Sequence, residues 1–251
     1  GGSSDVAIQG GGGQRTYDYV VKPGDGDDLE NALASDTYTS VFIPAGTYIV
    51  NEIIIVDNVK RIVGAGRGNT TIQFLGDGYY LRVEEDYCSI EEITFTNGGH
   101  SAGPGQVYIT GDFVTIENCY SNNSNEDGFE YDSAAGYISF TNCLVESAAE
   151  DGFQGVNTNV TSKLVNCSAR NCSGDGFEDC NNLSNCIVYG LGNTIIGFRG
   201  CDRISSSYVR GCEYGFYGCY QISACKVNGN SVSGTTGLSG CYYISSCQVI
   251  N

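Results

Sequence analysis

Residues 116–143 read IENCYSNNSNEDGFEYDSAAGYISFTNC, and residues 140–167 read FTNCLVESAAEDGFQGVNTNVTSKLVNC. The second stretch repeats the first after 24 residues. Both begin with a hydrophobic residue shortly before Asn-Cys, carry Asp-Gly-Phe in the middle, and end on the next Asn-Cys. Such self-similarity predicts a repeat architecture, in which each unit needs its neighbours to complete a core.

The same unit continues toward the C-terminus. The glycine of a Gly-Phe or Gly-Leu pair recurs after 24, 24, 21, 18 and 22 residues, at Gly128, Gly152, Gly176, Gly197, Gly215 and Gly237. A second column contains Cys119, Cys143, Cys167, Cys186, Ser207, Cys225 and Cys247. A third column follows the aromatic residue by three positions and contains Val156, Cys180, Cys201, Cys219 and Cys241.

The repeat predicts its own fold class. Its strands, of about four residues, are too short to bury a hydrophobic face alone, so neighbouring units must pair strand on strand, roughly 4.8 Å apart. β-Branched residues, Cys, Ser and Gly are poor helix formers, and the regular Leu spacing of leucine-rich repeats is absent from the sequence. The pattern predicts an all-β parallel solenoid.

Two further features point to a known family. Asparagines precede the second column, at Asn118, Asn142, Asn166 and Asn185. Residues 27–34 (DDLENALA) read as a short amphipathic helix, ahead of residues 41–48 (VFIPAGTY) and 62–68 (IVGAGRG). These motifs resemble the right-handed parallel β-helix of the pectin lyase-like superfamily, as found in pectate lyases and phage tailspikes. The resemblance covers about residues 20–251 and implies an asparagine ladder and a capping helix.

We therefore predict one right-handed parallel β-helix in three regions. Residues 1–19 form a flexible Gly-rich leader, residues 20–40 the N-terminal cap, and residues 41–251 the coils. The longest loop signal is residues 97–105 (NGGHSAGPG). Because a bare terminal coil exposes strand edges, we expect that the natural chain continues beyond residue 251 or that a partner subunit covers this end.

Composition excludes several classes of partner. The chain of 251 residues has 12 basic and 29 acidic residues, a net charge of −17, which repels nucleic acid and anionic membranes. Hydrophobic residues make up 41%, too many for a disordered acidic tail. No apolar run reaches the roughly eighteen residues of a transmembrane helix. We predict no nucleic-acid partner and no membrane insertion.

Stacked carboxylates are the first candidates for chemistry. Asp127, Asp151 and Asp175 stand two residues before the aromatic column, so they should lie on successive coils, and Glu178 follows that column. Carboxylates about 5–10 Å apart are compatible with glycoside hydrolysis, so these four residues are the candidate catalytic groups. No metal site is assigned and no cofactor is required, although Ca²⁺ is the candidate if an ion binds. The alternative is turn chemistry, with Asp capping the backbone where Gly adopts positive φ.

Outward side chains are the second set of candidates. In enzymes that the chain resembles, the strand with the aromatic column carries the active site. Tyrosine, of which there are 18, offers a rigid face and a hydroxyl to sugars, although it also simply fills pleated surfaces. Tyr220 and Tyr242 are expected in turns. The candidate carbohydrate-binding residues are Glu130, Arg199, Tyr208, Tyr217, Tyr220 and Tyr242.

The enzyme motifs of the superfamily are mostly missing. The sequence has no Gly-His-Gly or Arg-Ile-Lys of polygalacturonases, no Asp-Pro-His-Glu of alginate epimerases and no Trp. The single histidine, His100, could act as a general base, but a polar surface residue is the alternative. Whether the chain is an enzyme stays open; if it is one, we expect a polysaccharide depolymerase of the hydrolase or lyase type.

Thirteen cysteines occur without any C-x-x-C spacing. Columns of Cys resemble small buried core residues, and side chains stacked in parallel disfavour disulfides. We predict mostly reduced, buried thiols and folding in a reducing cytosol, as for virion components.

Three functions follow as hypotheses. The first is a β-helical module of a viral or phage tailspike or tail-fibre protein that recognises, and in one version cleaves, host surface polysaccharide. The second is a free-standing polysaccharide lyase, hydrolase or epimerase. The third is a structural or filament-forming surface solenoid. The expected partners are host or environmental polysaccharide and further copies of the chain, as a trimer or stacked end to end. The expected location is the virion surface or the extracellular space.

Overall fold

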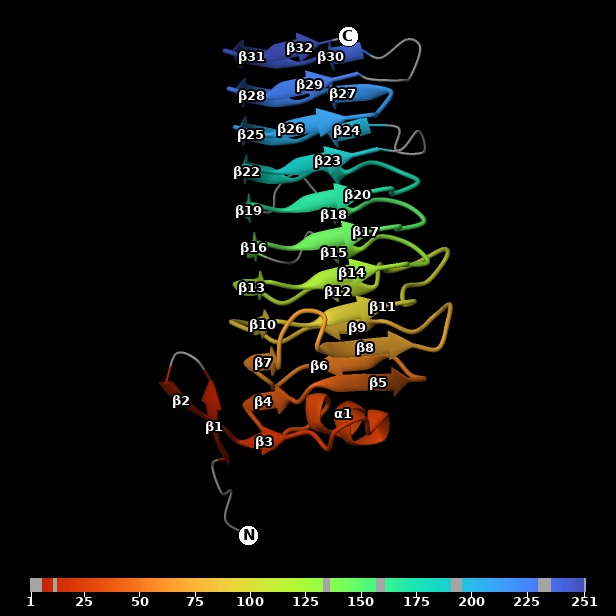
Figure 1. The fold of residues 1–251 in the computed structure, drawn as a ribbon, viewed down its shortest axis with the longest axis vertical. Helices are drawn as coiled ribbons and strands as arrows, with labels where there is room; N and C mark the ends of the chain where they lie inside the picture. Colours follow the sequence, from red (N-terminus) through yellow and green to blue (C-terminus); the bar gives the residue numbers. More distant parts are fainter. Residues whose placement is uncertain are drawn as a thin grey trace.

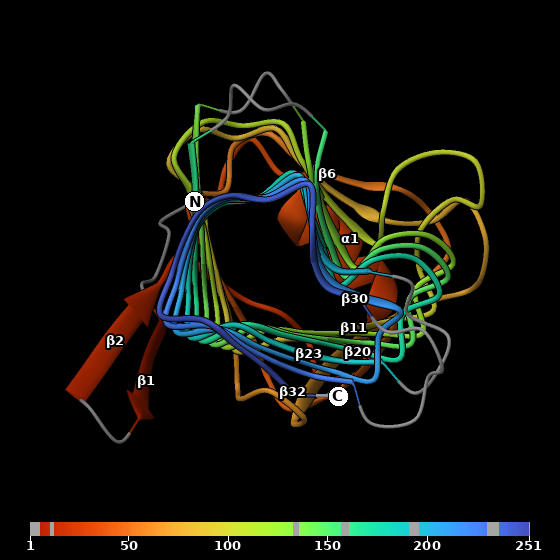
Figure 2. The ribbon, with the colours of Figure 1, turned by 90° about the horizontal axis from the view of Figure 1, so that it is seen from above.

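A computed structural model describes the fold for residues 6–10, 13–132, 136–156, 161–190, 196–229 and 236–250. The chain winds into a single parallel β-solenoid of about nine turns, seen upright in Figure 1 with its N-terminal end at the bottom. Each full turn adds one strand to each of three sheets. Figure 2, which looks along the axis, shows the three sheets as the walls of a tube. The predicted fold class is confirmed.

In the described part of the chain, all strands except an N-terminal antiparallel pair fall into three parallel sheets. Sheet 1 contains β3 (Tyr19–Val20), β4 (Ser40–Ile43), β7 (Arg61–Gly64), β10 (Ser89–Glu91), β13 (Val114–Glu117), β16 (Tyr137–Thr141), β19 (Thr161–Val165), β22 (Asn181–Ser184), β25 (Asp202–Ser205), β28 (Tyr220–Ser223) and β31 (Tyr242–Ser245). Sheet 2 contains β5 (Gly46–Val50), β8 (Thr70–Phe74), β11 (Thr94–Thr96), β14 (Tyr120–Asn122), β17 (Leu144–Glu146), β20 (Ser168–Arg170), β23 (Ile187–Tyr189), β26 (Tyr208–Arg210), β29 (Lys226–Asn228) and β32 (Gln248–Ile250). Sheet 3 contains β6 (Ile54–Val56), β9 (Leu81–Val83), β12 (Val107–Ile109), β15 (Phe129–Tyr131), β18 (Phe153–Gly155), β21 (Phe177–Glu178), β24 (Ile196–Arg199), β27 (Tyr214–Tyr217) and β30 (Thr236–Ser239).

The register stacks each sequence column along the axis. Phe153 pairs with Phe129 on one side and with Phe177 on the other. The rings of Phe153 and Phe177 lie 4.9 Å apart and 5° from parallel, and Phe177 stacks on Phe198 in the same way. All these rings are fully buried. The stacked rings of this aromatic column therefore form a continuous part of the core from Phe129 to Phe198.

The glycine column is explained by crowding and not by turn geometry. Gly152 does not have a positive φ. A Cβ placed on it would lie 2.6 Å from the carbonyl oxygen of Gly176 and 2.7 Å from Cβ of Ala169. Gly176 and Gly197 face the same kind of contact. Each strand of sheet 3 begins close to the backbone of the next coil and to a side chain of sheet 2, and only glycine leaves room for both. The expectation that this glycine adopts a positive φ in a turn is therefore wrong.

The asparagine ladder forms at the corner between sheets 1 and 2. Nδ2 of Asn142 donates to Oδ1 of Asn118 at 3.1 Å, and Nδ2 of Asn166 donates to Oδ1 of Asn142 at 3.1 Å. All three residues have φ near +55°, a conformation that Asn tolerates better than most residues. Asn185 keeps the same backbone conformation. The ladder that the sequence predicted is thus confirmed for Asn118, Asn142 and Asn166.

The cysteine columns lie inside the tube as free thiols. Eleven of the thirteen cysteines are buried and two, Cys241 and Cys247, are partly buried. Many of the thiols donate to core carbonyls one coil earlier, as Sγ of Cys143 does to Ile116 O at 3.4 Å and Sγ of Cys219 does to Phe198 O at 3.2 Å. Burial raises the pKa of Cys88 to about 12. Cysteine thus serves as a small core residue with a weak hydrogen bond.

The N-terminal end of the tube is closed by α1 (Gly26–Leu33). Its N-cap residue Asp25 accepts from the N–H of Asp28, and its Leu29 and Leu33 are buried against the first coil. Beside it, β1 (Val6–Gly10) and β2 (Gly13–Tyr17) form an antiparallel hairpin that stands out from the tube in Figure 1. These two strands lie within residues 1–19, the range expected to form the leader, and the flexibility of that leader stays a prediction.

The last coil exposes residues that are buried elsewhere in the repeat. Ile244 is 43% exposed and Val249 is 43% exposed, whereas Ile222 and Val227 one coil earlier are buried. Whether more chain or a partner covers this coil stays a prediction. Within the described residues, no helix is both long and apolar enough to cross a membrane.

We expect Phe153→Ala to lower the free energy of unfolding by about 3–5 kcal/mol, because it leaves a cavity inside the aromatic column. Urea unfolding followed by circular dichroism measures this. The matched control is Phe113→Ala, since Phe113 is 47% exposed and should cost about 1 kcal/mol or less. Equal losses in the two variants would contradict the stacked core.

Candidate active site on sheet 3

The candidate catalytic residues lie where the chain enters sheet 3 from sheet 2. Asp127, Asp151 and Asp175 precede β15, β18 and β21 by one turn residue, while Glu178 lies at the end of β21. Figure 2 shows the loops between sheets 2 and 3 standing out on this side of the tube. The repeat therefore places all four carboxyl groups along one edge of sheet 3.

The three aspartates form a hydrogen-bonded ladder. Oδ1 of Asp127 accepts from the N–H of Asp151 at 2.7 Å, and Oδ1 of Asp151 accepts from the N–H of Asp175 at 2.5 Å. Oδ1 of Asp175 accepts from the N–H of Ile196 at 3.1 Å. All three are buried, with 3%, 5% and 3% of their surface exposed. Each aspartate thus caps the next coil, a structural role close to the turn chemistry that the sequence left open.

Burial raises the pKa of all three carboxyl groups. It raises the pKa of Asp127 to about 8, because desolvation outweighs the N–H bond from Asp151. It raises the pKa of Asp151 to about 10, assisted by a hydrogen bond with Glu178 and by the charge of Asp127. The pKa of Asp175 reaches only about 6, because the Arg199 guanidinium partly offsets its burial. At neutral pH Asp127 and Asp151 hold their protons.

Asp151, Asp175 and Glu178 meet in one cluster. Carboxyl oxygens of the three lie within 4.8 Å of one another. Arg199 completes the cluster from the next coil: its Nε lies 2.9 Å from Oδ2 of Asp175, and it also pairs with Glu178. Nε2 of Gln154 donates to Oε2 of Glu178 at 3.3 Å.

Asp151 and Glu178 are neighbours whose pKa values shift in opposite directions. Burial raises the pKa of Asp151, whereas hydrogen bonds from Asp151, Arg199 and Gln154 lower the pKa of Glu178, although burial alone would raise it. A carboxyl that favours its proton therefore lies beside one that favours ionisation, and such divergent pKa values are typical of acid and base roles. The Glu178 side chain is 15% exposed and Arg199 44%, so these two residues face solvent while Asp151 lies beneath them.

The cluster fits a calcium ion poorly. It offers oxygens of three carboxylates at one place, whereas Ca²⁺ takes six to eight oxygen ligands. The guanidinium of Arg199 lies against two of these carboxylates and would compete with a cation. The candidate Ca²⁺ remains untested, and the chemistry considered below needs none.

Sheet 3 continues this polar face into coils that the repeat did not mark. Oε2 of Glu130 accepts from the N–H of Gly105 at 2.6 Å, and the hydroxyl of Tyr108 donates to Asp132 at 2.8 Å. The guanidinium of Arg82 lies 6.0 Å from the ring of Tyr108. Sequence reasoning missed Arg82 and Tyr108, because their coils lack the Gly-Phe pair; the register with Glu130 was the signal that could have found them.

The candidate sugar-binding residues do not share one face. Glu130, Arg199 and Tyr217 lie on sheet 3, and Tyr208 lies on sheet 2. Tyr220 and Tyr242 begin strands of sheet 1, with rings stacked 4.8 Å apart, so the expectation that they lie in turns is wrong. Tyr220 borders a hollow of about 480 Å³ at the corner between sheets 3 and 1.

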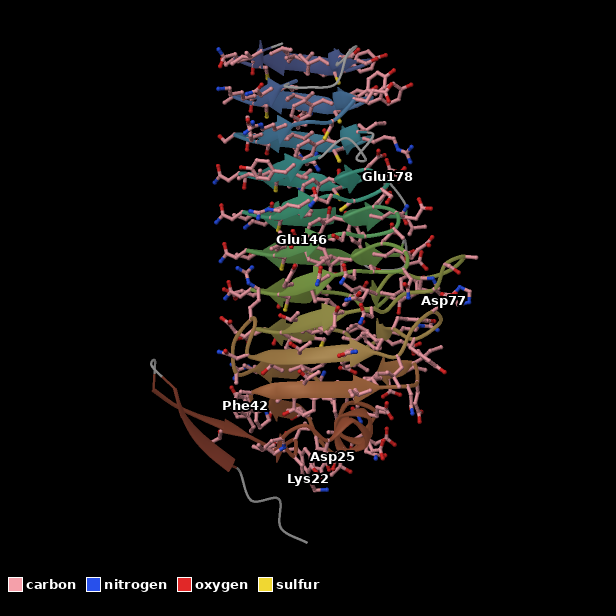
Figure 3. All side chains as sticks on the ribbon, turned by 45° about the vertical axis from the view of Figure 1, so that its right-hand side comes forward. Lys22, Asp25, Phe42, Asp77, Glu146 and Glu178 are labelled. Carbon is pink, nitrogen blue, oxygen red and sulfur yellow. The ribbon has the colours of Figure 1, made fainter. Side chains whose placement is uncertain are left out.

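His100 remains a local loop residue. Its side chain is exposed, and its Nδ1 accepts from the N–H of Ala102 at 3.2 Å. The neighbouring Ser101 bonds to Asp77, which Figure 3 shows on the protruding loops, away from Glu178. Nothing in these contacts connects His100 with the cluster on sheet 3.

Three parallel sheets and a row of polar side chains along one of them define a parallel β-helix with a candidate ligand face. The family model described as the right-handed β-helix region matches residues 53–200, more than half of the chain. The chain belongs to this right-handed β-helix family. No curated protein matches the sequence significantly.

Solved structures with a similar fold include a glucanase, an epimerase and a pectate lyase. The catalytic domain of a GH87 α-1,3-glucanase in complex with nigerose aligns with a TM-score of 0.68 and 14% identity, over 92% of this chain and 53% of that chain. A mannuronan C-5 epimerase module from Azotobacter vinelandii aligns with a TM-score of 0.58 and 15% identity, over 87% and 76%. A pectate lyase aligns with a TM-score of 0.56 and 17% identity, over 82% and 69%. The chain spans about half the length of the GH87 chain. At these identities the likeness shows the fold alone, which is the right-handed β-helix that the sequence predicted.

We expect the protein to lose stability as the pH rises from about 4 toward 8. The unfolded aspartates release their protons near the ordinary value of 3.8, whereas folded Asp127 and Asp151 keep theirs. The unfolded state then binds fewer protons, and each such group contributes a slope of up to about 1.4 kcal/mol per pH unit. Thermal unfolding between pH 5 and pH 8 measures this.

Asp127→Asn should reduce the loss of stability between pH 5 and pH 8. The fold should persist, since Asn keeps an acceptor for the N–H of Asp151. An unchanged pH profile in this variant would show that Asp127 is ionised in the folded protein.

Proposed function

We propose that the protein binds a polysaccharide along the outward face of sheet 3 and hydrolyses it there. The observation that carries this proposal is the cluster of Asp151, Asp175 and Glu178, whose carboxyl oxygens lie within 4.8 Å of one another. Arg199 pairs with Glu178 at the surface of this cluster, and the pKa values of Asp151 and Glu178 shift in opposite directions. The fold supports it, because the similar solved structures are those of a glucanase, an epimerase and a pectate lyase. The row of polar side chains along sheet 3 gives a sugar chain several coils to contact.

The proposed roles follow from burial. Glu178 and Arg199 reach solvent and would touch the sugar, while Asp151 supplies the proton that it shares with Glu178. Breaking the glycosidic bond needs one proton on the leaving oxygen, and the attacking water gives one proton back. A pair that holds a single proton can deliver it and recover it, so its charge is unchanged after each turnover. Asp175 and Gln154 keep Glu178 in position.

Recognition without cleavage is the second candidate. It is favoured by the ladder, because each aspartate already uses one oxygen to cap the next coil. A structural solenoid without a glycan ligand is the third candidate, and a free-standing lyase or epimerase is a variant of the first. The three differ in what they do to a polysaccharide, so one experiment separates them.

We further propose that this module works on a viral or phage tailspike or tail fibre, or on another extracellular surface, as a homotrimer. Support comes from the acidic charge of −17 and from thiols that stay reduced inside the tube. Analytical ultracentrifugation of the purified chain should then give three times the monomer mass of 26.6 kDa. A monomer at all concentrations contradicts self-assembly of this chain.

We expect Glu178→Gln to reduce cleavage of the matching glycan by about 100-fold or more, because Gln cannot take part in proton transfer. The protein is incubated with a panel of bacterial surface polysaccharides, and both retention on the glycan and new reducing ends are followed. The matched control is Glu146→Gln on sheet 2, where Glu146 accepts from the hydroxyl of Tyr120; Figure 3 labels both glutamates.

Each outcome assigns a function. Cleavage that is lost in Glu178→Gln and kept in Glu146→Gln supports the depolymerase. Retention without new ends in the unchanged protein makes it a binding module. If the protein neither retains nor cleaves any glycan, the structural solenoid is the function that remains.

A further inference from the structure

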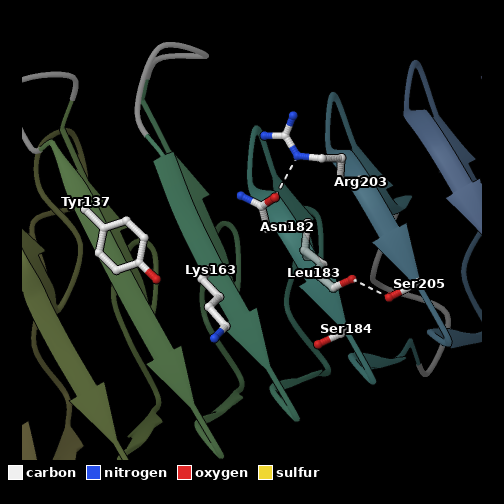
Figure 4. Close-up of a pocket in the computed structure, with 7 residues that line it drawn as sticks. All are labelled: Tyr137, Lys163, Asn182, Leu183, Ser184, Arg203 and Ser205. Carbon is white, nitrogen blue, oxygen red and sulfur yellow. Dashed lines mark hydrogen bonds between the residues drawn. The ribbon is translucent and has the colours of Figure 1, made fainter.

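The outward face of sheet 1 carries a shallow groove that the acidic cluster does not touch. Its lower part is a hollow of about 440 Å³, lined by Tyr137, Lys163, Asn182, Leu183, Ser184, Arg203 and Ser205. Figure 4 shows Tyr137, Lys163, Asn182 and Arg203 on four neighbouring strands, from β16 to β25, all on the outward side. This surface therefore crosses the strands and follows the axis of the solenoid.

The groove continues over the last strands of sheet 1. A second hollow of about 370 Å³ shares Arg203 and Ser205 with the first and reaches Tyr243 on β31. Tyr243 is 78% exposed. Together the two hollows span six neighbouring strands, β16, β19, β22, β25, β28 and β31.

The charge of this groove is opposite to that of the molecule. Neither hollow is lined by an aspartate or a glutamate, although the chain has 29 acidic residues. Arg203 pairs with Asp202 at 2.9 Å and donates to Oδ1 of Asn182 at 2.6 Å. Lys163 is exposed, and within the described residues no carboxylate lies in ion-pair distance of it. The groove thus presents two cationic side chains: Lys163, which has no ion-pair partner among the described residues, and Arg203, which has one.

A column of hydroxyl groups runs along the floor. Ser184, Ser205, Ser223 and Ser245 pair in register on consecutive strands. Parallel strands repeat about every 4.8 Å, so a hydroxyl recurs at each coil. Tyr137 stands at one end of the groove and Tyr243 at the other, each with a ring and a hydroxyl suited to sugar contacts.

The backbone of this face is held in an unusual conformation. Asn182, Arg203, Gln221 and Tyr243 each have φ between +50° and +54°, at equivalent places in four consecutive strands. Asn accepts this conformation readily, but Arg, Gln and Tyr rarely do. The Cα pairing skips these residues, as between Asn181–Asp202 and Leu183–Ile204. Both strands of each pair leave out one residue at this place, so the register is kept; such strained backbone conformations cluster at functional sites.

We propose that this groove on sheet 1 is a second glycan-binding surface, which holds an acidic polysaccharide along the axis of the solenoid. Lys163 and Arg203 contact carboxylate or sulfate groups of the sugar chain, the serine column bonds its hydroxyls, and the two tyrosines lie against its rings. This site does not depend on the proposed cleavage on sheet 3. It goes beyond that function, because it assigns the acidic class of ligand to a different face.

Binding of a polyuronate to the full chain tests the proposal. The background variant is Glu178→Gln, so that the ligand stays intact, and a neutral glucan serves as the uncharged probe. Lys163→Glu should weaken polyuronate binding by about three- to tenfold, because it replaces an exposed attraction by a repulsion. Lys163→Arg should bind like the background. Affinity is measured by calorimetry at two salt concentrations.

The matched control is Lys226→Glu, because Lys226 is an exposed strand residue of sheet 2. The proposal is upheld if binding falls in Lys163→Glu, is retained in Lys226→Glu, and is weaker for the neutral glucan. Equal losses in both lysine variants, or none in Lys163→Glu, overturn it. Polyglutamate that binds as tightly through Lys163 also overturns it, since the groove would then recognise charge alone. Cleavage is scored separately, so failure of the sheet 3 proposal leaves this test intact.

Discussion

Parallel pairing between successive coils is the interaction on which everything else in this protein depends. Among the described residues no strand is longer than five residues, and none of these strands buries a face without the coils above and below it. In-register pairing turns every repeated residue into a column along the axis. The same constraint that stacks phenylalanine on phenylalanine also stacks aspartate on aspartate, where burial forces the carboxyl groups to keep protons. The raised pKa values of Asp127 and Asp151 are therefore a consequence of the repeat.

Much of the fold could be predicted from the repeated columns of the sequence. The spacing of Gly-Phe pairs predicted coils, the Asn-Cys pairs predicted a ladder beside buried thiols, and residues 27–34 predicted the cap, which begins one residue earlier in the structure. Turn placement was harder, because variable turn lengths hide where a strand begins. Tyr220 and Tyr242 consequently belong to strands although their sequence suggested turns.

The chemistry was only partly readable. Sequence placed Asp127, Asp151 and Asp175 in one column, but could not show that their oxygens cap the next coil, because that depends on the height between coils. The salt links of Arg199 to Asp175 and Glu178 also required coordinates, since the three residues come from adjacent coils with unequal spacing. Of the groove on sheet 1, only the serine column of Ser184, Ser205, Ser223 and Ser245 repeats in the sequence. Lys163 and Arg203 occupy positions that no column repeats, and only the fold brings them together.

The side-chain ladders also have a direction. In the aspartate and asparagine columns, and where a cysteine thiol bonds to another coil, the hydrogen comes from the later coil and the accepting oxygen from the earlier one. Examples are Asp151 to Asp127, Asn142 to Asn118 and Cys143 to Ile116. A finished coil thus offers open acceptors to the segment that follows it in the sequence. Because a ribosome releases the chain from its N-terminus, each coil can serve as the template for the next as it emerges. The coils can therefore fold one after another in the order in which the ribosome makes them.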